Sequence, residues 1–458
     1  IDTLTEMAQA GGFNALFVQV RRRGDTYYPS AIDPWAPDAD PEFDALAYLI
    51  EEAHASGIEV HAWATTLAIW NGDTPPSAPD HAFNQHGPGA TGRDYWLMTS
   101  ADGRDRADDG TAYLDPGHPD VVEYTVAVYA ELAARYDLDG LHLDRIRYPW
   151  QNYGYNPTAL VRFQTQAGRV DRPQADDPQW LQWRRDQLTA IVRRVYLTTT
   201  AIKPRLRVSA ALSAAGWPPS DSAPWEGRTP YSHHLQDWPA WLEEGIIDLG
   251  LPMVYRDEDT GAASFDGWIE WARDHQGERG TVIGTGLYLN AVQDSMSQWQ
   301  RARQPSPSGH RVLGISGYSY ATPSDEGVSQ LAFANVAATE VFTQAATTPA
   351  IPWKDFPVRG HLMGVLTPSL PCRPPLDGHS LTLTGPQNQA LVADGSGWFG
   401  AVDLPPGQYL LTTEIMTPSW VVNVPVTVSS GAVVEQQVLL PDCQQTVKRL
   451  YLPLIQKK

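Results

Sequence analysis

The sequence has only two cysteines, Cys372 and Cys443, in 458 residues, and it contains no CxxC or HExxH pattern. Structural zinc sites and zinc-protease sites need closely spaced Cys or His ligands, so neither is expected here. No other metal or cofactor is predicted. The two cysteines either form one disulfide, which would suit an oxidising compartment outside the cytoplasm, or stay unpaired.

Positive charge is also scarce. The chain has 33 Lys and Arg against 53 Asp and Glu, a net charge of −20. Such a chain repels phosphate backbones, so nucleic acid is not an expected partner. No run reaches the roughly 18 to 20 apolar residues of a membrane span. GxGxxG, GxSxG and glycine-rich phosphate loops are missing too, which argues against dinucleotide redox chemistry, serine hydrolysis and phosphoryl transfer.

The start of the chain shows no signal peptide. It begins at Ile1, inside an amphipathic pattern that includes Leu4 and Met7. We therefore expect a processed or truncated product whose export signal lies upstream, and a secreted or cell-surface location. The sequence does not indicate an oligomeric state.

Seven short apolar runs alternate with helical patterns along the first three quarters of the chain. They cover residues 15–20, 58–65, 140–144, 206–213, 246–255, 281–289 and 312–320. Such alternation predicts a parallel sheet covered by helices. A (β/α)₈ TIM barrel needs eight strands, and here a helix precedes the first visible one. We therefore predict a barrel whose first strand lies upstream of the chain, with an open doubly wound sheet as the alternative.

The alternation of strand and helix patterns ends near residue 345. We predict a catalytic barrel over residues 1–345 and a proline-rich linker over 346–359. Short alternating strands separated by turns then predict a small all-β sandwich domain over 360–445, followed by a tail over 446–458.

Polar and aromatic side chains gather at the ends of the predicted strands. In a TIM barrel the carboxyl ends of the strands carry the active site. We expect substrate-binding roles for Gln19, Arg21, His61, Trp63, Trp70, His142, Arg147, Tyr148, Tyr255, Tyr288 and Tyr318. His61 and His142 alternate with apolar residues, so an interior structural role stays open for both. The 17 tryptophans and 19 tyrosines include rings suited to stacking on sugars, although core packing must account for most of them.

The stretch "DGLHLDRIRYP" ends a predicted buried strand on Asp144, between apolar residues and two arginines. A carboxylate there is costly unless it is paired or used. Cleavage of a glycosidic bond needs two carboxyl groups. Asp144 is the predicted nucleophile or general base, Asp257 is the first choice for the acid and Asp237 the second. A structural ion pair of Asp144 with Arg145 or Arg147 is the alternative.

Five stretches resemble the bacterial glycosyl-hydrolase-like family 10 proteins, namely "FNALFVQVRRRGDTYYPS", "GIEVHAW", "YLDPGHPDVVEYTV", "DGLHLDRIRYP" and "QDWPAWLEEGIIDLGLPMVY". The resemblance covers about residues 1–340 and implies a secreted or surface barrel that acts on a glycan. Some relatives act on peptidoglycan strands without peptides. "DGLHLD" also looks like the fourth-strand segment of the alpha-amylase superfamily, whose aspartate is the nucleophile.

The chain departs from that family at one position. Many members read "DDYFYP" where this chain reads "DRIRYP", so Arg145 replaces a second acid. The segment "DGSGWFGAVDLPPGQYLL" is similar to carboxypeptidase-regulatory-like sandwich domains. Together these features predict a glycoside hydrolase of O-glycosyl bonds, outside the cytoplasm, acting on a polysaccharide such as an amino-sugar glycan. A non-catalytic glycan-binding or attachment barrel, and a polysaccharide lyase or deacetylase, are the alternatives.

Overall fold

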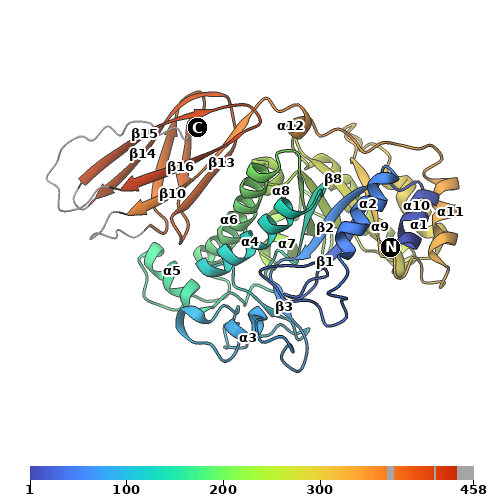
Figure 1. Ribbon diagram of the computed structural model, residues 1–458, viewed down its shortest axis with the longest axis horizontal. Helices are drawn as coiled ribbons and strands as arrows, with labels where there is room; N and C mark the ends of the chain where they lie inside the picture. Colours follow the sequence, from blue (N-terminus) through green and yellow to red (C-terminus); the bar gives the residue numbers. More distant parts are fainter. Residues whose placement is uncertain (369–375, 417–418, 441–458) are drawn as a thin grey trace.

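The larger part of the molecule is a curled sheet of parallel strands surrounded by helices (Figure 1). The computed structural model describes residues 1–368, 376–416 and 419–440. In their order of pairing the strands are β1 (Ala15–Arg21), β2 (Glu59–Thr65), β5 (Gly140–Asp144), β6 (Arg207–Ser213), β7 (Leu249–Met253), β8 (Gly280–Gly286) and β9 (Gly314–Tyr318). All neighbouring pairs are parallel. The predicted barrel-type fold is confirmed, and the purely sequential strand order excludes the doubly wound alternative.

The seven strands coincide with the seven predicted apolar runs. Small differences occur at their ends, because residues Leu287–Leu289 form the 3₁₀ turn η3 and β7 begins only at Leu249. Strands β1 and β9 form the two edges of the sheet and do not pair with each other in the described residues. A further strand would close the barrel at this position, so the upstream strand stays a prediction. Helix α1 (Asp2–Ala10), ahead of β1, packs against α11 (Gln330–Glu340).

The outer layer consists of amphipathic helices, and several of them begin at a capping side chain. They are α2 (Ala45–Ala55), α4 (Pro119–Arg135), α6 (Pro178–Ile202), α8 (Trp238–Glu244), α9 (Glu258–Asp274) and α10 (Val292–Ala302). The side chains of Asp44, His118 and Asp177 accept hydrogen bonds from the first-turn amides of α2, α4 and α6. These bonds satisfy amides that have no partner inside the helix. Each helix turns its apolar face toward the strands, as Val121 and Leu132 of α4 illustrate.

Long connections follow β2, β5 and β6 and build one end of the barrel. They contain β3 (Ala68–Trp70), α3 (Ala82–His86), η1 (Gly92–Asp94), β4 (Ala112–Tyr113), α5 (Pro157–Ala167), η2 (Trp225–Gly227) and α7 (Thr229–Ser232). The labelled segments β3, α3 and α5 lie toward the lower part of Figure 1. They follow the carboxyl ends of strands, the end at which TIM barrels place their active sites.

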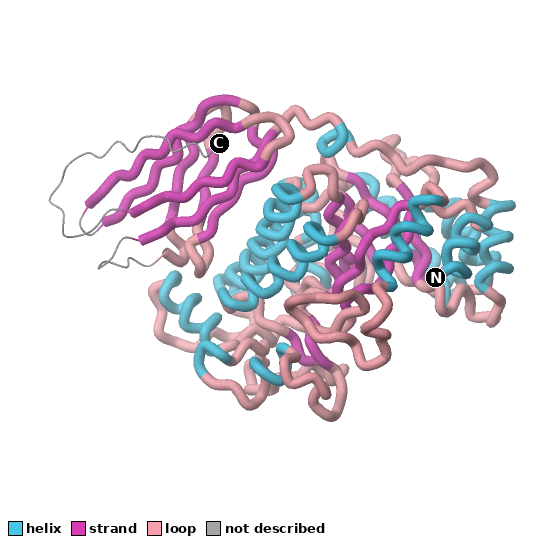
Figure 2. Tube along the Cα trace, viewed as in Figure 1, coloured by secondary structure: helices cyan, strands magenta, loops and turns pink. Residues whose placement is uncertain are grey.

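The C-terminal part consists of two packed sheets, seen as magenta strands at the upper left of Figure 2. Its strands are β10 (Gly360–Pro368), β11 (Ser380–Thr384), β12 (Gln389–Val392), β13 (Trp398–Leu404), β14 (Gly407–Met416), β15 (Ser419–Val428) and β16 (Val433–Leu440). One sheet has the order β13-β10-β16 and the other β12-β11-β14-β15. Leu362, Phe399 and Leu411 lie in the core between them. The predicted sandwich architecture is confirmed, whereas Cys372, Cys443 and the tail lie outside the described residues.

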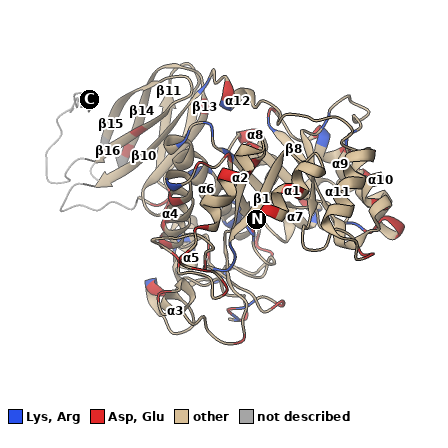
Figure 3. Cartoon of the chain, turned by 45° about the vertical axis from the view of Figure 1, so that its right-hand side comes forward, with Lys and Arg blue, Asp and Glu red and all other residues tan. Residues whose placement is uncertain are grey.

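The sandwich packs against α6 on the outside of the barrel. Arg194 of α6 lies 2.7 Å from Glu123 of α4 and 3.3 Å from Asp394, which precedes β13. Arg162 of α5 forms a bidentate pair with Asp377, at 2.5 and 2.7 Å. The short helix α12 (Pro352–Asp355) lies between barrel and sandwich. Acidic and basic residues occupy mainly the helices and loops of the barrel, while the sandwich strands are largely tan in Figure 3. No helix in the described part of the chain is long and apolar enough to cross a membrane.

Candidate active site

Asp144 ends β5 with its carboxylate half-buried and held by two donors. Trp63 of β2 donates from Nε1 to Oδ2 at 3.1 Å, and the amide of Arg145 donates to Oδ1 at 2.7 Å. Arg145 has φ 53°, the left-handed region that a non-glycine residue adopts at a cost. The chain therefore turns sharply directly after Asp144, and the turn is tied to the carboxylate itself.

Four aromatic rings form a cluster that reaches this carboxylate through Trp63. Tyr318 lies at the centre, with its ring centroid 6.0 Å from Trp63, 5.5 Å from the stacked ring of Tyr255 and 6.1 Å from Tyr288. Tyr288 and Tyr318 are about two-fifths exposed, at 40% and 39%. Burial, and then the negative charge of Asp144, raise the pKa of Tyr255. Rings that are partly accessible next to a carboxylate are the surfaces on which sugars stack.

Arg147 completes the group that we call the barrel mouth: Trp63, Asp144, Arg147, Tyr255 and Tyr318. Within the described residues, the buried Nη1 of Arg147 has no hydrogen-bond acceptor. Burial, and then repulsion from Arg145, lower the pKa of Arg147. The structure thus brings together five of the residues that the sequence suggested, from β2, from β5 and its following loop, from the residues after β7, and from the end of β9.

Below the barrel mouth the interior holds His142 and His61. His142 is buried, and its Nδ1 lies 2.9 Å from Oγ of Ser209. Burial lowers the pKa of His142 to about 4, so the ring is neutral. His61 stacks on Phe17 at 4.5 Å and pairs in register with Gly140, the first residue of β5. That position is four residues, or about 13 Å, from Asp144 along the strand, so His61 lies deep in the barrel and away from the barrel mouth.

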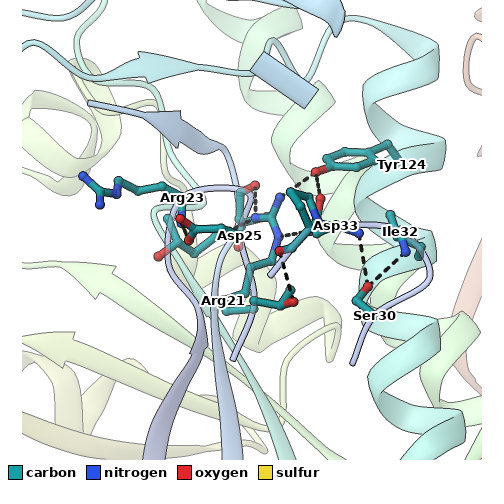
Figure 4. Close-up of polar contacts among 12 residues, drawn as sticks. Arg21, Arg23, Asp25, Ser30, Ile32, Asp33 and Tyr124 are labelled. Atoms are coloured by element: carbon teal, nitrogen blue, oxygen red, sulfur yellow. Dashed lines mark hydrogen bonds and ion pairs between the residues drawn. The ribbon is translucent and has the colours of Figure 1, made fainter. Parts of the chain in front are cut away.

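Arg21 is part of a buried polar network at the end of β1, shown in Figure 4. Its Nε lies 2.6 Å from Oδ2 of Asp33, and both side chains are almost fully buried, at 2% and 1% exposure. Its Nη2 donates to the hydroxyl of Tyr124 at 2.9 Å, and its Nη1 donates to the carbonyl of Thr65. Tyr124 also donates to Asp33. These bonds and its burial enclose the guanidinium of Arg21 in the protein, so a sugar does not reach it, and its bond to Thr65 positions the end of β2.

Three other predicted binding residues have different surroundings. Trp70 is 9% exposed and donates from Nε1 to the carbonyl of Thr74 at 2.8 Å, as part of the core under β3. Tyr148 is fully buried. Gln19 is half-buried, and its Nε2 lies 3.5 Å from Oγ1 of Thr65, the neighbour in register of Asp144. Of these three, only Gln19 is close to the barrel mouth.

With this geometry established, the chain can be compared with known proteins. The family model described as glycosyl hydrolase-like 10 matches residues 1–302. The chain belongs to this family.

Two curated relatives of this glycosyl hydrolase-like 10 chain carry hydrolase names. Glycosyl hydrolase YngK of Bacillus subtilis is 25% identical over 371 residues, covering 77% of this chain and 68% of that protein. Glycosyl hydrolase DigH of Escherichia coli K12 is 28% identical over 298 residues, covering 60% of this chain and 61% of that protein. The match thus spans about three-fifths of the length of DigH.

Two solved structures share the fold at low sequence identity. The PgaB (BpsB) glycoside hydrolase domain of Bordetella bronchiseptica matches with a TM-score of 0.55 and 16% identity, covering 73% of this chain and 92% of that one. The catalytic domain of beta-amylase from Paenibacillus polymyxa matches with a TM-score of 0.51 and 13% identity, covering 75% of this chain and 95% of that one. Both are glycosidase barrels, so the barrel fold of this family member is a glycoside-hydrolase-type fold.

The two aspartates suggested as the acid in this family member each hold a hydrogen bond from another group. Asp257 caps α9, and its Oδ1 accepts bonds from the amide and hydroxyl of Thr260, both at 2.9 Å. Asp237 lies at the start of α8, where its Oδ1 accepts a bond from Nε1 of Trp225 at 2.8 Å. Burial raises the pKa of Asp237, and its nearest charge partner, Arg185, belongs to α6 in the helix layer. These contacts do not test the acid role of Asp257 or of Asp237, which stays a prediction.

Sequence reasoning missed three residues near Asp144. They are Tyr113, Asp109 and His234. Nη1 of Arg145 donates to the hydroxyl oxygen of Tyr113 at 2.9 Å and lies 3.7 Å from Oδ2 of Asp109. Nδ1 of His234 lies 2.8 Å from Oγ of Ser213, at hydrogen-bond distance. Tyr113 stands in a stretch that carried the family resemblance, but Asp109 and His234 lie in long loops without any local pattern. Within the described ranges, no three His, Cys, Asp or Glu side chains form a metal-binding group.

Proposed function

We propose that this chain cleaves O-glycosidic bonds of a polysaccharide outside the cytoplasm, and that amino-sugar glycans such as peptidoglycan strands are its first candidate substrates. The observation that carries the proposal is the accessible carboxylate of Asp144 at the end of β5, held by Trp63 and flanked by Tyr255 and Tyr318. A carboxylate beside aromatic rings suits a sugar ring at the point where its glycosidic bond breaks. The family membership and the names of the relatives agree with this reaction.

In the proposed mechanism Asp144 is the nucleophile or the general base. Its two hydrogen bonds set the direction of the carboxylate, and a positioned carboxylate is what this role requires. The second carboxyl group is assigned to Asp109. Asp109 lies on the loop before β4, and its side chain is 51% exposed. It forms an ion pair with Arg145, the residue whose amide donates to Asp144. It therefore replaces Asp257 and Asp237 as the candidate acid.

The test is the release of reducing ends from a panel of polysaccharides that includes peptide-free peptidoglycan strands. Activity of the purified chain on one glycan, lowered at least about 100-fold in Asp144→Asn and in Asp109→Asn, is the expected result. The variant Asp257→Ala is the matched control, because it removes a carboxylate that only caps a helix. Full activity in Asp144→Asn would refute the assignment, and full activity in Asp109→Asn alone would move the acid elsewhere.

A second function is favoured by one observation. Arg145 occupies the position where many family members have an acid, and the carboxylates of Asp257 and Asp237 already accept hydrogen bonds from Thr260 and Trp225. A non-catalytic glycan-binding barrel would have these features. It predicts glycan binding without new reducing ends, and with equal binding by the chain and by Asp144→Asn.

A further inference from the structure

Arg147 is the feature that the proposed mechanism leaves unexplained. It follows Asp144 by three residues, yet no carboxylate in the described ranges lies within 4.0 Å of its guanidinium, since no ion pair of Arg147 occurs there. Its Nη1 is buried and has no acceptor. Arg147 as a whole is half-buried. A buried guanidinium nitrogen without an acceptor is costly, and folded proteins rarely keep one unless a ligand, water or ion completes it.

The carboxylates nearby are engaged by other donors. Asp144 accepts from Nε1 of Trp63 and from the amide of Arg145, and Asp109 lies against Nη1 of Arg145. Arg145 itself is held by the hydroxyl of Tyr113. Each of these charged groups therefore has a partner within the protein, whereas Arg147 has a free donor between them.

The surroundings of Arg147 carry positive potential although the whole chain has a net charge of −20. The clearest sign is His234, whose pKa falls to about 3 through burial and then through the charges of Arg147, His233 and Arg145. His234 is therefore neutral, and it lies close enough to Arg147 for the charge of that guanidinium to affect its pKa. The charge of Arg147 also affects the hydroxyl of Tyr255: it lowers the pKa of Tyr255, whereas the charge of Asp144 raises it. An anion placed among these groups would gain a charge-assisted hydrogen bond and relieve the repulsion.

We propose that Arg147 is an anion-binding subsite of the barrel mouth, and that the glycan bound beside Asp144 carries a carboxylate on the sugar ring that contacts it. This inference rests on the proposed function and narrows its substrate class to acidic sugars. Arginine suits this role, because its planar guanidinium forms two parallel bonds to a carboxylate. Since Arg147 follows Asp144 by three residues, in the loop after β5, the acidic sugar is expected at the scissile bond or next to it.

The experiment compares two oligosaccharides with one backbone. The acidic probe is a peptide-free amino-sugar oligosaccharide with lactyl carboxylates, and the neutral probe is the same compound with these groups reduced to alcohols. Binding is measured by calorimetry in the full chain carrying Asp144→Asn, so that no turnover occurs. The acidic probe is expected to bind about 10- to 100-fold more tightly. Arg147→Gln should remove this preference and leave the neutral probe within about twofold, as a lost charged hydrogen bond predicts.

Two further variants separate recognition from folding. Arg147→Lys keeps the charge but loses the paired geometry, so it should keep part of the preference. Arg145→Gln is the matched control, because Arg145 is already held by Tyr113 and Asp109, and most of the preference should survive. Each variant is first shown to unfold at the temperature of the parent chain. An oligosaccharide of uronic acids forms a second acidic arm, and whichever acidic compound shows the Arg147-dependent preference identifies the source of the carboxylate.

Equal binding of acidic and neutral probes by the parent chain would overturn the inference, as would no binding of any acidic probe. An equal loss for both probes in Arg147→Gln would also overturn it and would make Arg147 a structural charge near Asp144. The binding preference and the hydrolysis of glycans are measured separately, so the two proposals can fail independently. A preference for acidic probes without hydrolysis would refute the proposed hydrolase alone, and hydrolysis of glycans without that preference would refute the subsite alone.

Discussion

The buried pair of Arg21 and Asp33 allows a quantitative test of how the fold supports the barrel mouth. Asp33→Asn keeps the shape of the side chain and removes its charge. Arg21 would then be a buried cation without a counter-ion, and the loss of one member of a buried pair typically costs about 3–5 kcal/mol. Arg21 still keeps the carbonyl of Thr65 and the hydroxyl of Tyr124, so we expect a value near the lower limit, about 3 kcal/mol.

The charge of Arg21 is secured by its surroundings. Burial by itself would lower the pKa of Arg21, but the charge of Asp33 and the hydrogen bonds of Asp33 and Tyr124 outweigh it and raise the pKa above its ordinary value. The guanidinium is therefore charged in the parent chain. In Asp33→Asn the support of the Asp33 charge is lost, but arginine does not give up its proton in proteins, so the guanidinium stays charged as long as the fold persists. The measurement is urea unfolding of both chains, followed by far-ultraviolet circular dichroism, with the free energy of unfolding extrapolated to water.

Two further variants make the test specific to the buried pair. Asp38→Asn removes a carboxylate of the same loop that only accepts an exposed bond from Tyr27, so it should change stability by less than about 0.5 kcal/mol. Replacing both members of the pair, with Arg21→Met and Asp33→Leu, should recover at least half of the loss, because no unpaired charge remains. A loss below about 1 kcal/mol in Asp33→Asn would refute the reasoning, since the pair would then contribute no more than an exposed one.

Two more predictions concern other aspartates. Asp257→Ala should lower the free energy of unfolding by about 1 kcal/mol through loss of the α9 cap, with turnover of the substrate unchanged; a large loss of turnover would restore Asp257 as the catalytic acid. Burial raises the pKa of Asp115 to about 7, so the folded chain holds this proton while the unfolded chain releases it. The contribution of Asp115 to stability therefore falls as the pH rises from about 4 to about 7. Urea unfolding should show the parent chain losing about 2–3 kcal/mol relative to Asp115→Asn between about pH 5 and about pH 8, and parallel curves would contradict this.

Much of the barrel was predictable because strands and helices leave local patterns. The runs around Leu141 and Leu143 are buried on both faces, and such runs read as parallel strands without further information. Asp144 was found in the same way, because a polar residue that ends such a run must lie at the carboxyl end of the barrel. Trp63, Tyr255 and Tyr318 also follow or end predicted strands. For these residues, position along a strand determines position in the site.

The residues that sequence reasoning misplaced depend on partners far away in the chain. Arg21 was predicted to bind substrate, and only the fold shows that Asp33 and Tyr124 enclose its guanidinium (Figure 4). His61 looked like a site residue, and the register of β2 with β5 places it about 13 Å below Asp144. The same distant contacts bring Asp109 to Arg145 from a loop that carries no pattern.

The sequence by itself therefore determined the order of strands and helices, the sandwich and the carboxylate at the end of β5, because apolar periodicity and strand ends are properties of neighbouring residues. Only the tertiary structure decided which charges are paired. It shows that Asp257 caps a helix, that Arg21 is enclosed by its network and that Arg147 keeps a free donor. The physical reason is that charge pairing depends on distances of a few ångströms between segments that are remote in the chain. No local pattern records such distances.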